Sequence, residues 1–176
     1  MKLKTVLTIA GSDSSGGAGI QADIKAITMN GVYASSVITA LTAQNTTGVY
    51  GIQETPADFI AAQMDAVFSD IFPDAVKIGM LPSPDAMKCV ASRLRQYKPA
   101  HIVLDPVMVS TSGHRLMDPK AEITLKEELF PLAELITPNI PEAEVLTGLL
   151  ITDDDSMERA CYELYARFHC AILLKS

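Results

Sequence analysis

Polar side chains follow two apolar segments in the second half of the chain. Asp105 comes directly after the apolar run 102–104, and Asn139 and Glu142 follow the run 135–137. Proteins bind Mg²⁺ through one or two carboxylates, and waters and phosphate oxygens complete its shell. Asp105 and Glu142 are therefore candidate magnesium ligands, with Asn139 beside them. The alternative for Glu142 is an acid in the first turn of a helix, where the helix dipole favours it.

A second group of candidates lies in the loop 11–19, which reads GSDSSGGAG. Its backbone N–H groups stand next to a predicted helix start, an arrangement that binds an anion or the polar edge of a ligand. The loop is not a Walker A motif, because no Gly-Lys-Ser/Thr follows, and it lacks the GxGxxG spacing. A tight turn without a ligand explains the spacing equally well.

Two polar residues near this loop are further candidates. Gln44 ends an apolar run, between Ala43 and Asn45. Its amide offers both a donor and an acceptor, which suits the edge of a heterocycle, and a plain turn residue is the alternative. Asp23 falls in the first turns of a predicted helix, where a solvated acid is the alternative.

These candidates need a scaffold, and strand-length apolar runs alternate with amphipathic segments along the chain. The first helix carries Ile20, Ile24 and Ile27 at helical spacing. We predict strands over 5–10, 36–43, 49–54, 76–78, 102–104, 135–137 and 171–174, and later helices over about 57–71, 84–97, 119–130, 141–146 and 156–168, the last capped by Asp155 or Ser156.

The alternation predicts the architecture. Strand–helix–strand order implies parallel pairing with right-handed crossovers, and continuously apolar strands imply a sheet buried on both faces. The predicted fold is a three-layer α/β/α domain, Rossmann-like, with a mostly parallel central sheet. Ligands bind such sheets beyond the carboxyl ends of the strands. The residues that follow the predicted strands therefore define the candidate site: Gly11, Gln44, Met80, Asp105, Asn139 and Lys175.

Composition narrows the class of protein. The chain has 176 residues, 48% of them apolar and 20% charged, with a net charge of −7, which is typical of a globular protein. The absence of a Lys/Arg cluster disfavours nucleic-acid binding, and no apolar run approaches the ~20 residues of a membrane span. Cys89, Cys161 and Cys170 form no CxxC pair, so we expect no disulfide framework, no zinc site and a cytoplasmic location.

Five stretches carry a resemblance to a known family. LTIAGSDSSGGAGIQADIKA, VITALTAQNTTGV, PDAVKIGML, IVLDPVMVSTSG and ITPNIPEAEVLTG resemble the hydroxymethylpyrimidine/phosphomethylpyrimidine kinases of thiamine biosynthesis, in the family's order; they stand at 7–26, 37–49, 73–81, 102–113 and 136–148. The resemblance implies a ribokinase-like fold and a homodimer. It also implies MgATP-dependent phosphorylation of 4-amino-5-hydroxymethyl-2-methylpyrimidine and then of its monophosphate.

The resemblance assigns roles residue by residue. Gln44 would hydrogen-bond the pyrimidine. Asp105, Asn139 and Glu142 would organise Mg²⁺ and the ATP phosphates, and Lys175 would lie near those phosphates. The residues that would line the substrate pocket are Gly11, Ala18, Asp23, Met80 and Val107.

One departure from the family pattern limits these expectations. Family members continue further and carry a Gly-Thr-Gly anion hole with a Cys or Asp base, but no Gly-Thr-Gly occurs in this sequence. We therefore expect residues 1–176 to be a single kinase domain that is incomplete at its C-terminus, with the catalytic base beyond Ser176 and negligible turnover alone. Two alternatives stay open: a pyridoxal/pyridoxine kinase, and a non-catalytic pyrimidine-binding fragment.

Overall fold

The computed structural model describes residues 3–108, 117 and 119–176. Within these ranges the strands form one seven-stranded sheet in the order β3-β2-β1-β4-β5-β6-β7. Every neighbouring pair is parallel except β2–β3, an antiparallel hairpin at one edge, so the predicted mostly parallel sheet is confirmed. The strands are β1 (Thr5–Asp13), β2 (Tyr33–Asn45), β3 (Gly48–Glu54), β4 (Ala75–Ile78), β5 (Ile102–Leu104), β6 (Leu135–Ile136) and β7 (Ala171–Ile172).

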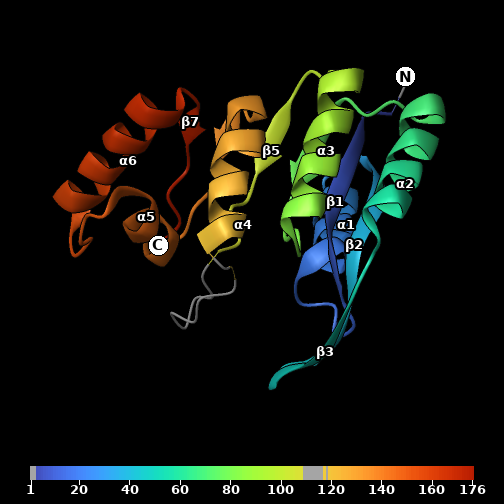
Figure 1. The fold of residues 1–176 in the computed structure, drawn as a ribbon, viewed down its shortest axis with the longest axis horizontal. Helices are drawn as coiled ribbons and strands as arrows, with labels where there is room; N and C mark the ends of the chain where they lie inside the picture. Colours follow the sequence, from blue (N-terminus) through green and yellow to red (C-terminus); the bar gives the residue numbers. More distant parts are fainter. Residues whose placement is uncertain (1–2, 109–116, 118) are drawn as a thin grey trace.

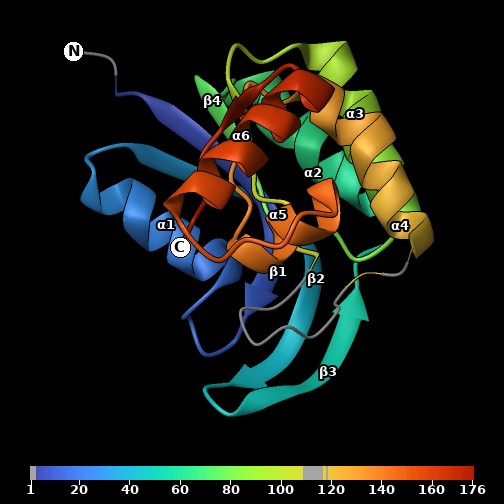
Figure 2. The ribbon, with the colours of Figure 1, turned by 90° about the vertical axis from the view of Figure 1, so that its left-hand side faces the viewer.

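Helices lie on both faces of the sheet, which confirms the three-layer prediction. Figure 2 shows α1 on one side of the strands and α2, α3 and α4 on the other. In Figure 1, α6 and β7 lie at the end of the molecule opposite α2 and the β2–β3 hairpin. The helices are α1 (Gly19–Met29), α2 (Ala57–Asp70), α3 (Pro84–Tyr97), α4 (Pro119–Thr124), α5 (Ile140–Thr147) and α6 (Asp154–Phe168).

The hydrophobic core fills the space between the sheet and the larger helical layer. Ile9 of β1 and Leu104 of β5 belong to one buried cluster with Met87 of α3, Phe130 after α4 and Leu164 of α6. Burying side chains of this size contributes roughly 1.5–3 kcal/mol each. The sheet is therefore a rigid platform for the residues that follow its strands.

Two strands are longer than predicted. β1 continues to Asp13 and β2 to Asn45, where the sequence pattern predicts ends at residues 10 and 43. The additional residues of β1 pair with β2 past a bulge between Ala10 and Ser12. The apolar pattern in the sequence does not reveal this extension, because its residues are small and mostly polar and backbone pairing does not require apolar side chains. The last residues of β2 pair only with β3, so the hairpin projects beyond the sheet (Figure 1).

Two helix ends also differ from prediction. Regular α4 stops at Thr124 and continues as the π-helical turn η1 (Leu125–Leu129) and the 3₁₀ turn η2 (Phe130–Leu132). Pro131, which lacks a backbone N–H, stands in this last turn. The predicted cap of α6, Asp155 or Ser156, is wrong. Asp153 is the N-cap, and its carboxylate accepts from the Ser156 N–H in a capping box.

No helix in the described ranges is both long and apolar enough to cross a membrane. The resemblance stretch 102–113 is described only as far as Met108, and its remaining residues lie outside the described part of the chain.

Candidate active site at the carboxyl edge of the sheet

One predicted site residue stands near the carboxyl end of each of the six parallel strands. Across the sheet the order is β2, β1, β4, β5, β6 and β7. The residues met in that order are Gln44, Gly11, Met80, Asp105, Asn139 and Lys175. The structure thus brings residues that are far apart in sequence to one edge, as the strand-end rule predicts.

The loop after β1 is closed on itself by Asp13. One carboxylate oxygen of Asp13 accepts from the Ser15 N–H (2.8 Å) and the Ser15 hydroxyl (2.7 Å). The other accepts from the N–H groups of Gly17 (2.9 Å) and Ala18 (2.8 Å). The Ser15 hydroxyl bond is the main cause that lowers the pKa of Asp13 below its ordinary value. Because Asp13 already occupies these donors, the structure favours the tight-turn interpretation over an anion cradle.

Gly11 and Met80 meet at the centre of the edge. A Cβ on Gly11 would collide with the terminal methyl group of Met80. Gly19, at the start of α1, has φ +56°, and a Cβ there would collide with the carbonyl oxygen of Gly11. Ser12 and Gly19 also form an isolated antiparallel bridge. The first turn of α1 therefore touches the end of β1, and this close approach requires glycine.

Gln44 is held through its backbone rather than its side chain. The Ser14 hydroxyl donates to the Gln44 carbonyl (2.7 Å) and accepts from the Gln44 N–H (2.8 Å). The side-chain oxygen of Gln44 accepts from the Thr42 hydroxyl at 3.2 Å. Among the described residues, the amide nitrogen of Gln44 has no hydrogen-bond partner. This side chain is therefore available to read a ligand edge.

Asp23 is in contact with a cation that the sequence pattern did not indicate. Its Oδ2 accepts from the Thr8 hydroxyl (2.6 Å) and from Lys77 Nζ (2.9 Å). The side chain of Asp23 is 18% exposed, so it is not the solvated acid of the alternative interpretation. The sequence feature that could have indicated Lys77 is a single lysine within the apolar strand β4, where a partly buried cation gains from a partner.

Charged residues cluster at the other half of the edge. Lys175 Nζ lies 2.8 Å from Asp105 Oδ1, and both side chains are partly exposed. The Lys175 N–H donates to the Pro138 carbonyl (2.8 Å), and Lys175 forms a parallel bridge with Asn139. Val107 follows at the same edge, half-buried, and its N–H donates to the Asp105 carbonyl (2.9 Å).

Glu142 is buried beneath this cluster, with 2% of its surface exposed. Its two carboxylate oxygens accept from the N–H groups of Met108 (3.2 Å) and Asn139 (2.8 Å), and the Asn139 side chain accepts in return from the Glu142 N–H. Burial raises the pKa of Glu142 above its ordinary value. Glu142 is thus the first-turn acid of the alternative interpretation, and it also stands close enough to Asp105 for the two charges to interact.

The carboxylates of this half fit a magnesium ion better than a metal that needs several protein ligands. In the described part of the chain, no group of three or more His, Cys, Asp or Glu residues is arranged to hold a metal. Mg²⁺ requires only one or two carboxylates, and Asp105 is partly exposed beside the buried Glu142. The donor set is therefore compatible with Mg²⁺.

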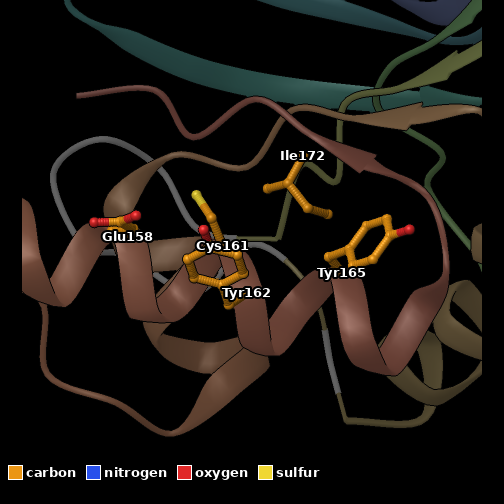
Figure 3. Close-up of a pocket in the computed structure, with 5 residues that line it drawn as sticks. All are labelled: Glu158, Cys161, Tyr162, Tyr165 and Ile172. Atoms are coloured by element: carbon orange, nitrogen blue, oxygen red, sulfur yellow. The ribbon is translucent and has the colours of Figure 1, made fainter.

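A cavity of about 370 Å³ lies elsewhere, between α6 and β7 (Figure 3). Its lining residues are Glu158, Cys161, Tyr162, Tyr165 and Ile172. None of the predicted site residues lines it. Burial raises the pKa of the Cys161 thiol, which makes the thiol a poor nucleophile. The candidate site is therefore the carboxyl edge of the sheet and not this cavity.

The chain is similar to known proteins over nearly its whole length. A family model described as phosphomethylpyrimidine kinase matches residues 13–176. The thiamine biosynthesis bifunctional protein ThiED of Geobacter sulfurreducens is 56% identical over 171 residues, which cover 97% of this chain and 35% of that protein. A hydroxymethylpyrimidine/phosphomethylpyrimidine kinase of Haemophilus influenzae is 48% identical over 173 residues, covering 98% and 64%. The chain thus spans less than two thirds of the length of either relative.

Solved structures give the same result. Phosphomethylpyrimidine kinase from Clostridium difficile superimposes with a TM-score of 0.91 at 49% identity, covering 98% of this chain and 74% of that one. Pyridoxal kinase from Staphylococcus aureus, in complex with AMP-PCP and pyridoxal, gives a TM-score of 0.86 at 31% identity, covering 100% and 63%. The ribokinase-like fold implied by the sequence is confirmed. The matching family model and these relatives show that the chain belongs to the phosphomethylpyrimidine kinase family.

Proposed function

We propose that this chain carries the pyrimidine pocket and part of the phosphate site of a kinase that uses MgATP to phosphorylate 4-amino-5-hydroxymethyl-2-methylpyrimidine and its monophosphate. One observation carries the proposal. The edge has two adjoining halves. The half around Gln44, Gly11 and Met80 can receive a heterocycle, and the half built from Asp105 and Lys175 is charged. A phosphoryl transfer to a hydroxymethyl heterocycle requires that juxtaposition.

The first half supplies recognition. The amide nitrogen of Gln44 can donate to a ring nitrogen, while the backbone of Gln44 is fixed by Ser14. Met80 and the bare backbone of Gly11 offer an apolar surface to one face of the ring. Ala18, in the turn organised by Asp13, and Val107 are proposed to complete the pocket wall.

The charged half is proposed to receive the phosphates of ATP. The ammonium of Lys175 can exchange Asp105 for a phosphate oxygen, and Asn139 stands beside it. Asp105 and Glu142 are the residues that would hold Mg²⁺, Glu142 through water because both of its oxygens already accept backbone N–H groups. Mg²⁺, when bound, supplies neutralisation of the phosphate charge.

Binding of the pyrimidine is the first test. Titration calorimetry of this chain with 4-amino-5-hydroxymethyl-2-methylpyrimidine should detect binding without ATP. Replacement Gln44→Ala should weaken that binding at least about tenfold, the effect of one good hydrogen bond. Gln53→Ala is the matched control, because Gln53 lies exposed on β3 of the same hairpin. Wild-type protein that binds no pyrimidine contradicts the proposal.

The alternatives make different predictions in the same experiments. Tighter binding of pyridoxal than of the pyrimidine would favour the pyridoxal kinase alternative, whose basis is the solved relative with pyridoxal. Release of ADP in the presence of the pyrimidine and MgATP tests phosphoryl transfer itself. Binding without ADP release would indicate a non-catalytic pyrimidine-binding chain.

A homodimer is a further proposal from the family resemblance. The projecting β2–β3 hairpin supports it, because it exposes the apolar side chains of Leu41, Val49, Tyr50 and Ile52. Sedimentation velocity measures the mass directly. A monomer at all concentrations in the micromolar range contradicts this proposal.

A further inference from the structure

Lys77 is an unusual residue for its place in the fold. It lies within the four-residue strand β4, where its neighbours Val76 and Ile78 are fully buried in the core. Its side chain points to the opposite face, toward α1, and its ammonium contacts the carboxylate of Asp23 at 2.9 Å. The Lys77 side chain is 27% exposed, and the Asp23 carboxylate is the partner of this partly buried ammonium group.

The ammonium of Lys77 reaches the functional edge of the sheet although its Cα lies mid-strand. A Cβ on Gly79 would stand 2.9 Å from Lys77 Nζ and 3.0 Å from the Cβ of Ala10. The charged end therefore lies level with Gly79, the residue between β4 and Met80. Ala10 immediately precedes Gly11, and Gly79 immediately precedes Met80. The ammonium therefore lies next to the two residues that precede Gly11 and Met80, which form the apolar surface of the pocket.

Of the two carboxylate oxygens of Asp23, one accepts two hydrogen bonds and the other is available to a ligand. Oδ2 accepts from both the Thr8 hydroxyl and Lys77 Nζ. Oδ1 has no hydrogen-bond partner among the described residues, and the side chain keeps 18% of its surface exposed. Two donors on one oxygen fix the rotation of the carboxylate plane. The second oxygen therefore has a defined direction before any ligand arrives.

We propose that Lys77 is a positioning residue, which holds Asp23 so that Oδ1 accepts an N–H donor of the pyrimidine, its exocyclic amino group. The inference rests on the proposed function, because it assumes that an aminopyrimidine enters this pocket. Lys77 itself does not contact the ligand. A carboxylate acceptor rejects a ligand that lacks the donor, so the pair contributes discrimination between ligands.

A purely structural role is the competing explanation. The Lys77–Asp23 contact ties α1 to β4, and its loss would lower the melting temperature whatever the ligand. Stability alone therefore cannot distinguish the two roles. Discrimination between two ligands can, because a structural tie acts equally on both.

The experiment measures dissociation constants by calorimetry for two probes, 4-amino-5-hydroxymethyl-2-methylpyrimidine and the same molecule without the amino group. We expect wild-type protein to prefer the amino compound at least about tenfold. Lys77→Met should reduce this preference to less than about threefold. Gly79→Ala should do the same with every charge retained, because its methyl group displaces the flexible end of Lys77. If Lys77→Met does not fold, Gly79→Ala decides.

The control is Gly51→Ala in β3, where an added Cβ makes an ordinary 3.8 Å contact with Ala43. It should keep the wild-type preference. The inference is overturned if both Lys77→Met and Gly79→Ala keep the full preference, or if wild-type protein binds the two probes equally. Equal binding leaves the proposed function intact, whereas failure to bind either probe overturns the proposed function itself.

Discussion

The two halves of the carboxyl edge are built by different means. Around Gly19 the geometry depends on backbone atoms of Gly11 that approach too closely for any side chain. Around Asp105 and Glu142 it depends on charged side chains, one pair partly exposed and one carboxylate buried. A rigid backbone surface suits a flat ring of fixed shape, while charged side chains can exchange partners when phosphates arrive. The difference predicts that mutations in the two halves fail in different ways.

The largest effect is expected from Gly19→Ala in the backbone-built half. Gly19 and Gly31 both have positive φ, +56° and +75°, but an added Cβ at Gly31 meets nothing within 4 Å. Gly31→Ala should therefore cost only the left-handed strain, about 1–2 kcal/mol of unfolding free energy. Gly19→Ala should cost about 3–5 kcal/mol, because α1 must also move away from Gly11. Urea denaturation followed by circular dichroism measures both, and equal losses would contradict the close approach.

Glu142→Gln should give the next largest effect, in the charge-built half. The glutamine amide can accept from only one of the two N–H groups, of Met108 and Asn139, that the carboxylate now serves. Leaving a buried donor unpaired should cost about 1–3 kcal/mol. Glu144→Gln, on the same helix, is the control for the chemical change. A loss equal to that of the control would show that the buried carboxylate is dispensable.

The two halves should also respond to pH in opposite directions. Burial raises the folded-state pKa of Glu142, so its stabilising contribution is complete below the unfolded pKa and is lost as pH rises through the folded value. The hydroxyl of Ser15 and the loop N–H groups lower the pKa of Asp13, so its contribution is lost as pH falls. Unfolding free energies from about pH 3 to 7 for Glu142→Gln and Asp13→Asn, each against wild type, should show slopes of opposite sign. Slopes of the same sign would remove this distinction.

Lys175→Met should have the smallest effect on stability. Its ion pair with Asp105 is partly exposed, and such pairs contribute about 0–1 kcal/mol. Lys4→Met is matched, because it removes an exposed ion pair with Asp74. Both should melt within a few degrees of wild type. Only Lys175→Met should weaken ATP binding, about tenfold, in a calorimetric titration; an equal effect of Lys4→Met would exclude a phosphate role.

The site was predictable where it depends on strand ends. Each apolar run marks a strand, and parallel strands bring the residues after them to one edge, so Gln44, Asp105 and Lys175 could be assigned to it. Asp13 and Lys77 were missed for a common reason. Their hydrogen-bond partners are brought close by the folding of a loop or by the pairing of distant strands. No periodic pattern in the sequence indicates which donor a carboxylate will contact.

The strand lengths show the same limit. The ends of β1 and β2 were placed too early, because the residues after Ala10 are small and polar while their backbones continue the sheet. The bounds of α3 were predicted correctly, because a serine at the N-cap (Ser83) and a proline in the first turn (Pro84) indicate a helix start in the local sequence. Local signals fix helix starts, and long-range pairing fixes strand ends.

The projecting β2–β3 hairpin has a consequence for the folding thermodynamics of the site. Beyond residue 42 it is a two-stranded ribbon, and such ribbons are marginal in water. The hairpin therefore forms a local cooperative unit that opens at lower free energy than the sheet. Gln44 belongs to this unit, and among the described residues its contact with the loop after β1 is through Ser14. Its amide should exchange with solvent hydrogen long before those of β1, so the pocket can admit a ligand without global unfolding.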